Sequence, residues 1–201
     1  MIITAESDQL EDYLVELEVV DYNHPLIKQK AAQLFTGPAD ELETVKTAYE
    51  YVRDSIAHSF DIQASTVTCR ASEVLYHGHG ICYAKANLLA ALLRGQGIPT
   101  GFCYQYLTRG ETPDTGYCIH TLTGVYLKTM DRWIRLDARG NKPGVEARFS
   151  AEQEKLAFPV REEYGEKDFF VVYRQPSART IDALRLSSDC QMLYESLPRE
   201  L

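Results

Sequence analysis

The spacing of apolar residues in this 201-residue chain changes at Gly97-Ile98-Pro99. Before this point, apolar residues recur every three or four positions, as they do on the buried side of a helix. After it, they alternate with polar residues over 101–107, 117–127 and 132–137, which is the pattern of half-buried strands joined by turns. Helices followed by an antiparallel sheet indicate the α+β fold class.

Breaks rich in glycine and proline separate the predicted elements. Cys82 to Arg94 is the strongest helix, because it is amphipathic and rich in alanine and leucine, and Gly97 follows it near the position of a left-handed cap. The other expected elements are helices after His24-Pro25, over 39–56, around 71–75 and over 177–201, and a strand over 168–173. Residues 13–21 fit a strand or a short helix. Without a visible linker or repeat, we expect one domain over 1–201, with its core at about 39–175 and helical extensions at both ends.

The charge balance bears on the partners of the chain. It holds 21 lysines and arginines against 29 aspartates and glutamates, a formal net charge of −8. Nucleic acids and anionic membranes attract a positive field, so this balance argues against both as partners. The first residues lack the basic and apolar stretches of a secretory signal, and no segment approaches the roughly 18 apolar residues of a membrane span. A cytoplasmic location is therefore expected.

The cysteines are odd in number, widely spaced and without a CxxC pair: Cys69, Cys82, Cys103, Cys118 and Cys190. This is typical of reduced thiols in a cytoplasm rather than of a disulfide framework or a zinc site. His77 and His79 stand close together, but no further ligand has a metal-binding spacing, so a solvated loop is expected there. The sequence predicts no metal ion and no cofactor.

Cys82 stands at the predicted start of the long helix, directly after Gly80-Ile81. The N-terminus of a helix carries partial positive charge and free N–H groups, which stabilise a thiolate, the reactive form of a thiol. The same N–H groups can stabilise the oxyanion that forms during acyl transfer. Taken alone, a cysteine at this position is more often a small buried hydrophobe.

A cysteine nucleophile needs a base, and the base needs an acceptor that orients it. If the turn between the strands over 117–127 and 132–137 is centred on Thr129-Met130, Leu122 faces Asp137 and His120 becomes a diagonal neighbour of Asp137 on the same face. The opposite face would then carry a core surface of Ile119, Val125, Leu127, Ile134 and Leu136. The conjunction of Cys82, His120 and Asp137 favours a catalytic triad over three unrelated structural residues.

Several segments resemble the bacterial transglutaminase-like superfamily over about 49–137. The helix end over 51–56 and the nucleophile segments over 71–75, 80–86 (GICYAKA) and 92–99 (LLRGQGIP) are similar to those of that family. Trp133 to Asp137 (WIRLD) is similar to its aspartate strand, and His120 stands where its histidine strand belongs. The resemblance implies a papain-like α+β fold in which the long helix packs on an antiparallel sheet.

The resemblance also implies a chemistry: Cys82 as nucleophile, His120 as general base and acid, and Asp137 as the residue that orients the histidine. The family includes proteases, cross-linking enzymes, peptide:N-glycanases and inactive relatives. Many members have a bulky aromatic residue two positions after the histidine, where this chain has Leu122. The substrate channel is therefore expected to be wider or different here.

Five residues are predicted to line the cleft or bind substrate: Tyr83, His79, Cys118, Leu122 and Trp133. Cys118 shares the predicted face of His120, and Trp133 shares that of Asp137, where it could shield the triad from water. The backbone N–H of Cys82 is expected as one oxyanion donor. For a donor on a side chain, Tyr83, Gln63 and Tyr76 are considered without a spacing that favours any of them.

The expected function is a cysteine hydrolase or acyltransferase that acts on a peptide, a protein or a small amide through a thioacyl-enzyme. Hydrolysis is preferred over transfer, because water needs no second specific pocket. A calcium-dependent cross-linking enzyme is disfavoured, since no acidic loop has a ligand-like spacing. The alternative is a binding module that keeps the cleft without turnover, in which Cys82 would react as an ordinary thiol.

Overall fold

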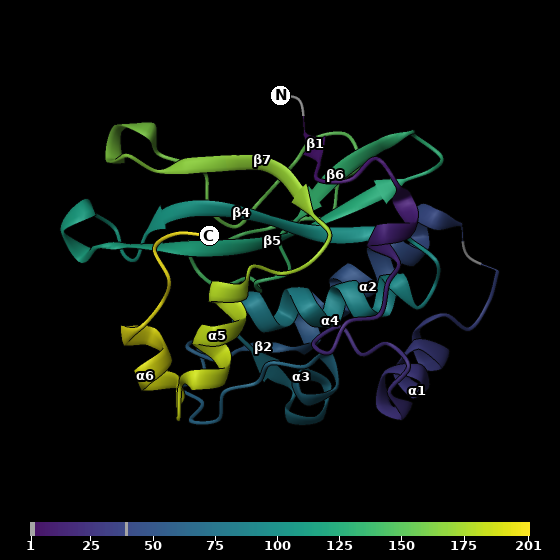
Figure 1. Cartoon of the computed structure of the whole chain (residues 1–201), viewed down its shortest axis with the longest axis horizontal. Helices are drawn as coiled ribbons and strands as arrows, with labels where there is room; N and C mark the ends of the chain where they lie inside the picture. The colour runs from purple at the N-terminus through teal and green to yellow at the C-terminus, as the bar shows by residue number, and fades with distance from the viewer. Residues whose placement is uncertain (1–2, 39) are drawn as a thin grey trace.

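The structure is a computed structural model, which describes residues 3–38 and 40–201. Its main sheet lies on one side and the principal helices lie on the other, as Figure 1 shows. The sheet has five strands in the order β1-β7-β4-β5-β6, and a second sheet pairs β2 with β3. In the main sheet, β1 and β7 run parallel, whereas the other neighbours pair antiparallel. This mixed architecture confirms the α+β prediction.

The main strands follow the alternating segments of the sequence. The strands are β1 (Thr4–Ala5), β2 (Ala57–His58), β3 (His79–Gly80), β4 (Thr100–Thr108), β5 (Tyr117–Leu127), β6 (Arg132–Leu136) and β7 (Lys167–Tyr173). The predicted register of β5 on β6 is confirmed, because Thr123 faces Leu136 and Val125 faces Ile134. The turn chemistry and the apolar alternation were thus sufficient to place these two strands.

The helices agree with the predicted ones except at the C-terminal end, where the helix predicted over 177–201 is two short helices, with 187–189 and 196–201 outside them. The helices are α1 (Pro25–Leu34), α2 (Glu41–Ser55), α3 (Ala71–His77), α4 (Cys82–Arg94), α5 (Ala178–Leu186) and α6 (Cys190–Glu195), with single 3-10 turns at Leu10–Tyr13, Pro113–Thr115 and Glu162–Tyr164. The helix predicted over 39–56 begins at Glu41, because the Asp40 side chain accepts a hydrogen bond from the amide of Glu43. Ala39 lies outside the described residues. Gly97, after α4, has the expected left-handed conformation with a φ of 73°.

Residues 13–21 form neither of the elements considered for them. Leu10–Tyr13 is one 3-10 turn, and the chain that follows is irregular apart from an isolated bridge. Its apolar residues are held by distant parts of the chain. The Tyr13 hydroxyl, for example, donates to the carbonyl of Val172 at 3.1 Å. Such tertiary contacts leave no periodic pattern in the local sequence.

The two faces of the main sheet are buried against different partners. The face that shares a core with α4 carries the buried residues predicted for it: Ile119, Val125, Leu127, Ile134 and Leu136. α4 is buried from Tyr83 to Arg94, so it forms the centre of this core. The opposite face carries a smaller cluster of Tyr13, Cys103, Leu122 and Val172. The fold therefore holds the start of α4 firmly beside the sheet.

β4 and β7 approach so closely at Gly101 that the position has no room for a side chain. A Cβ there would lie 2.5 Å from the carbonyl oxygen of Tyr173 and 2.6 Å from a methyl carbon of Val172. We expect Gly101→Ala to lower the free energy of unfolding by about 2 kcal/mol, because an overpacked core forces the backbone to shift. Urea denaturation measures the effect, with Gly37→Ala as the control, since nothing lies within 4 Å of a Cβ at Gly37. Equal stability of the two variants would contradict this account.

Candidate active site

His120 on β5 and Asp137, the first residue after β6, lie in direct contact. Nε2 of His120 is 2.8 Å from Oδ2 of Asp137. Such a side-chain contact is expected of diagonal neighbours on one face of two antiparallel strands. Both side chains are buried, with 6% of His120 and 1% of Asp137 exposed. Burial strengthens the pair, because water does not screen the charges or compete for the hydrogen bond.

Asp137 is held by two backbone amides in addition to His120. Its Oδ1 accepts from the amide of Arg139 at 3.0 Å, and its Oδ2 accepts from the amide of Ala157 at 3.1 Å. Burial alone would raise the pKa of Asp137, but the charge of His120 and these hydrogen bonds lower it. The carboxylate is therefore ionised at neutral pH and fixed in orientation.

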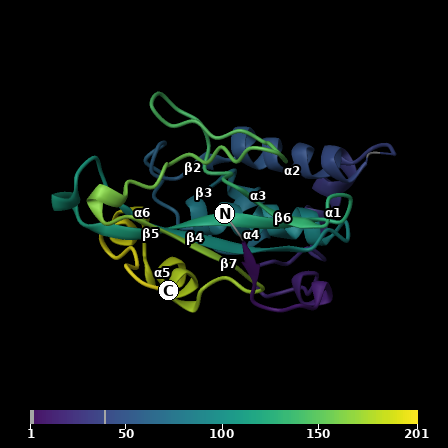
Figure 2. The same cartoon turned by 90° about the horizontal axis from the view of Figure 1, so that it is seen from above.

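Ala157 belongs to the long segment that joins β6 to β7. Figure 2 shows this segment passing beside α2, where the Arg53 side chain donates to the carbonyl of Ala147 at 3.2 Å. The segment thus returns to the site and adds an amide donor to the carboxylate. Because the segment is irregular, no periodic pattern in the sequence predicted the contact between the Ala157 amide and Asp137.

The protonation of His120 follows from its two partners. Burial on its own would lower the pKa of His120, but the charge of Asp137 and the neighbouring Cys82, with hydrogen bonding to both groups, raise it to about 10. Because Nε2 is engaged by Asp137, Nδ1 is the nitrogen left for Cys82. The imidazole therefore lies between the carboxylate of Asp137 and the sulfur of Cys82.

Cys82 is the first residue of α4, which the chain enters from β3 through Ile81. The thiol is free and partly exposed, and it lies within hydrogen-bonding reach of His120. The first amides of α4 have no partners within the helix and carry its partial positive charge. The thiol, the imidazole and the carboxylate therefore form one continuous chain of contacts that ends at a helix N-terminus.

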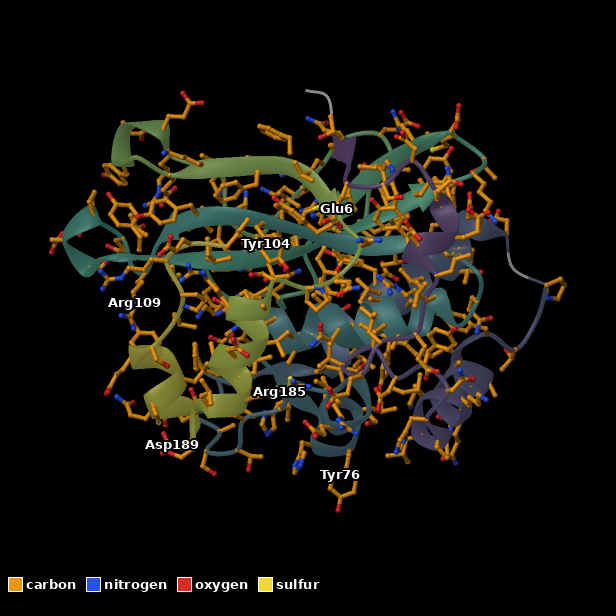
Figure 3. All side chains as sticks on the ribbon, in the orientation of Figure 1. Glu6, Tyr76, Tyr104, Arg109, Arg185 and Asp189 are labelled. Carbon is orange, nitrogen blue, oxygen red and sulfur yellow. The ribbon has the colours of Figure 1, made fainter. Side chains whose placement is uncertain are left out.

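Cys82 and His120 open onto a cavity of about 620 Å³, whereas Asp137 is buried behind the imidazole. Phe158, from the segment between β6 and β7, packs edge-on against the His120 ring with 5.2 Å between ring centroids. Arg109 and Tyr194 also line the cavity, and Figure 3 shows Arg109 at the β4–β5 hairpin beside α6. A substrate in this cavity could reach the thiol and the imidazole while the carboxylate of Asp137 stays shielded from water.

Two of the residues predicted for the cleft line this cavity, namely Tyr83 and Cys118. The prediction is wrong for His79, Leu122 and Trp133. His79 is buried and does not line the cavity, and its Nδ1 lies 3.0 Å from the Ser59 hydroxyl.

Leu122 and Trp133 share a strand face with His120 and Asp137, but they lie farther along the sheet. Leu122 is buried in the smaller cluster. Trp133 packs against Tyr13 and Tyr126, with ring centroids at 4.7 Å and 5.5 Å. Lying on the same face of the sheet as His120 is therefore not enough to place a residue at the cavity, because only one end of this face meets it. The aromatic side chain that contacts His120 is Phe158, which no pattern in the local sequence indicated.

None of the tyrosines considered as an oxyanion donor is suited to that role. The Tyr83 hydroxyl already donates to the carbonyl of Ile119 at 2.7 Å. Tyr76 is 75% exposed and points away from the body of the protein, as Figure 3 shows. The cavity is instead lined by His58 from β2. In the sequence this residue is marked only by its place just after the helix end that resembles the family.

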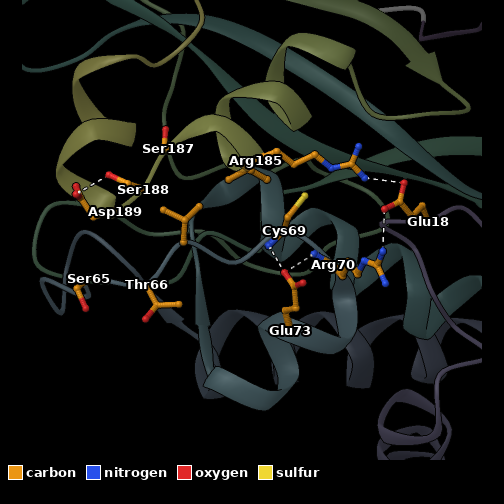
Figure 4. Close-up of a pocket in the computed structure, with 12 residues that line it drawn as sticks. Glu18, Ser65, Thr66, Cys69, Arg70, Glu73, Arg185, Ser187, Ser188 and Asp189 are labelled. Carbon is orange, nitrogen blue, oxygen red and sulfur yellow. Dashed lines mark hydrogen bonds and ion pairs between the residues drawn. The ribbon is translucent and has the colours of Figure 1, made fainter.

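A second cavity, of about 510 Å³, lies beside α3 and α5 (Figure 4). Its charged groups are paired within the protein, since Glu18 binds both Arg70 and Arg185 at 2.8 Å and 2.7 Å. Burial raises the pKa of its cysteine, Cys69, to about 11, so this thiol stays protonated at neutral pH. The cavity therefore offers no reactive thiolate at neutral pH.

Within residues 3–38 and 40–201, no group of three or more histidine, cysteine, aspartate or glutamate side chains is arranged to hold a metal ion. Over the same part of the chain, no helix combines the length and the apolar character that crossing a membrane requires.

The model of one protein family, the Transglutaminase-like superfamily, matches residues 28–138, which is more than half of the chain. The chain belongs to the transglutaminase-like superfamily. The matched range contains Cys82, His120 and Asp137. No protein with a curated description matches this transglutaminase-like chain.

Two solved structures resemble this member of the superfamily. One, described as a candidate cysteine protease from Cytophaga hutchinsonii, is 18% identical with a TM-score of 0.53, and the match covers 66% of this chain and 43% of that chain. Another, described as a candidate protease from Parabacteroides distasonis, is 19% identical with a TM-score of 0.40, covering 62% of this chain and 25% of that chain. This chain therefore matches less than half of the length of either structure. The first likeness supports the fold.

Proposed function

We propose that this chain is a cysteine hydrolase or acyltransferase that cleaves an amide bond. Cys82 is the nucleophile, His120 the general base and acid, and Asp137 the residue that orients His120. The contact of 2.8 Å between buried His120 and Asp137, continued to the thiol of Cys82, carries this proposal. Membership of the superfamily and an open cavity at the thiol support it.

The geometry supports the following steps. The Cys82 sulfur attacks the amide carbonyl carbon, a C–S bond forms, and the carbonyl electron pair moves to oxygen. The His120 imidazolium then gives its Nδ1 proton to the leaving nitrogen as the C–N bond breaks, which leaves a thioester. Water or an amine attacks the thioester while neutral His120 takes its proton, and the Cys82 thiolate departs.

The substrate in this proposal is a peptide, a protein or a small amide. Hydrolysis is the preferred outcome, because water reaches the thioester without a second binding pocket. The cavity of about 620 Å³ has the size of a site for a small molecule or a few residues of peptide.

The test is the pH dependence of iodoacetamide labelling at Cys82, located by mass spectrometry. We expect fast labelling well below pH ~8, because the proposed mechanism requires an ion pair between Cys82 and His120, and an imidazolium beside a cysteine favours the reactive thiolate. His120→Ala should remove this low-pH reactivity, so that labelling rises only where ordinary thiols ionise. A screen with peptide and amide libraries would then identify the substrate.

Cys118 is the matched control, since it lies in the same cavity. Burial, together with the nearby charge of Cys82, raises the pKa of Cys118 to about 12. It should therefore stay unlabelled at neutral pH, and Cys118→Ser should leave the reactivity of Cys82 unchanged. Slow labelling of Cys82 with an ordinary profile, in folded protein, would overturn the catalytic proposal and favour a binding module.

A further inference from the structure

We propose that His58 is the side-chain oxyanion donor of this site and that its imidazole N–H binds the oxygen of the tetrahedral intermediate. The inference rests on the proposed function and adds a catalytic residue to it. It answers a need that the triad leaves open, because acyl transfer develops negative charge on an oxygen that Cys82, His120 and Asp137 do not bind.

The small second sheet positions His58 beside the nucleophile. β2 runs parallel to β3, with His58 opposite Gly80, and the amide of Ser59 donates to the carbonyl of Gly80 at 3.2 Å. Gly80 is two residues before Cys82, so the pairing ties the histidine to the turn that presents the thiol. His58 and Cys82 line the same cavity.

The hydrogen bonding of His58 differs from that of a structural histidine. The residue is 9% exposed, its ring packs edge-on against Phe60 at 5.5 Å, and its Nδ1 is buried without a hydrogen-bond partner. A buried polar atom without a partner is costly, so an apolar side chain would serve better here if packing were the only demand. Because Nδ1 is buried, Nε2 is the nitrogen left to face the cavity.

The surroundings keep this imidazole neutral. Burial first, and then the charges of Arg139, Lys85 and His120, lower the pKa of His58 well below its ordinary range, against the opposing effect of Asp61. A neutral imidazole carries one N–H, and in this proposal the proton resides on Nε2, the nitrogen left to face the cavity. Such a ring can donate to an oxyanion without competing with His120 for the proton of the reaction.

Two reactions of Cys82 separate this role from that of the triad. With p-nitrophenyl acetate, the sulfur attacks the carbonyl carbon, the carbonyl electrons move to oxygen, and p-nitrophenolate leaves as the acetyl thioester forms. With iodoacetamide, the sulfur displaces iodide from carbon, and no oxyanion is formed. Loss of an oxyanion donor should therefore slow the first reaction selectively, whereas loss of thiolate activation slows both.

We expect His58→Phe to lower the rate of Cys82 acylation by about 100-fold, the usual effect of removing one oxyanion donor, while alkylation changes by less than about twofold. His58→Gln, which keeps a side-chain N–H, should recover part of the acylation rate. The matched control is His79→Phe, which removes the other buried histidine of the same small sheet without touching the cavity. Thermal melts confirm that each variant is folded.

The outcomes distinguish the two proposals. An unchanged ratio of acylation to alkylation in His58→Phe overturns the assignment of His58, whether both rates persist or both fall together. A parent protein whose Cys82 labels as an ordinary thiol overturns the proposed function itself. If His58→Phe does not fold, the same ratio in His58→Gln and in His58→Leu decides the question, and a ratio equal to the parent in both rejects the role.

Discussion

Asp137→Asn is expected to lower the turnover of p-nitrophenyl acetate by about 10⁴-fold at neutral pH, the size of effect that this substitution has in a hydrolytic triad. The carboxylate of Asp137 accepts hydrogen bonds from His120 and from two amides, those of Arg139 and Ala157. An asparagine can accept at only one of the two oxygen positions. Its amide nitrogen must then face an N–H group, and His120 loses both its orientation and its counter-charge.

The same loss changes the titration of His120. With Asp137 ionised, the pKa of His120 is raised from 6.5 to about 10. Without this charge the imidazolium is less stable, so the thiolate that it pairs with should also be lost at low pH. Alkylation of Cys82 by iodoacetamide should therefore require a higher pH in Asp137→Asn than in the parent protein.

Asp168→Asn is the matched control for this prediction. Asp168 lies on β7 of the same sheet and is mostly buried, but it binds Arg135 at 2.7 Å and not the histidine. Its replacement should leave turnover within about twofold for the folded fraction. A loss of less than about 10-fold in folded Asp137→Asn would contradict the orienting role of Asp137.

Lys85→Met is expected to lower the free energy of unfolding by about 3 kcal/mol near neutral pH. Nζ of Lys85 is buried in the core and donates to the carbonyls of Ile56 at 2.5 Å, Arg139 at 2.9 Å and Arg53 at 3.5 Å. Methionine keeps the length of the side chain but leaves these carbonyls without a donor, at a cost of about 1–3 kcal/mol for each buried group. Urea denaturation measures the loss, with the exposed Lys28→Met as the control.

The effect of Lys85→Met should also depend on pH. Burial, with the charge of Arg139, lowers the pKa of Lys85 from 10.5 to about 7. Between these values the unfolded chain binds a proton that the folded chain does not, so this group adds stability as pH rises through the window. The difference between parent and variant should therefore grow from neutral to alkaline pH. A difference that is constant or shrinks would contradict a buried amine at this position.

Lys85 also shows how the site is joined to the fold. Two of the carbonyls that it binds belong to Ile56 and Arg139, which lie two residues from His58 and from Asp137 respectively. One side chain of α4 thus connects the strand that carries the proposed oxyanion donor to the segment that follows Asp137. On α4 the residue looks like an ordinary polar interruption of an Ala/Leu helix. Its role depends on three backbone segments that the local pattern does not contain.

Much of the secondary structure could be predicted because it depends on local spacing. The limits of α4 and β5 and the register of β5 on β6 follow from apolar periodicity and from the turn between the strands. The same register predicted that His120 and Asp137 are neighbours. Periodicity gave no correct prediction for residues 13–21, because their buried side chains are held by distant strands. The single-domain boundaries, with a core at about 39–175, stay a prediction.

The sequence by itself determined the α+β class and the family, and it predicted the contact of His120 with Asp137, because each depends on residue type and on spacing along one or two neighbouring elements. Only the tertiary structure decided which side chains meet the cavity. It placed Phe158 and His58 there and buried His79, Leu122 and Trp133 elsewhere. The physical reason is that a strand pattern specifies a face, whereas a cavity forms where several distant segments fail to fill the space between them.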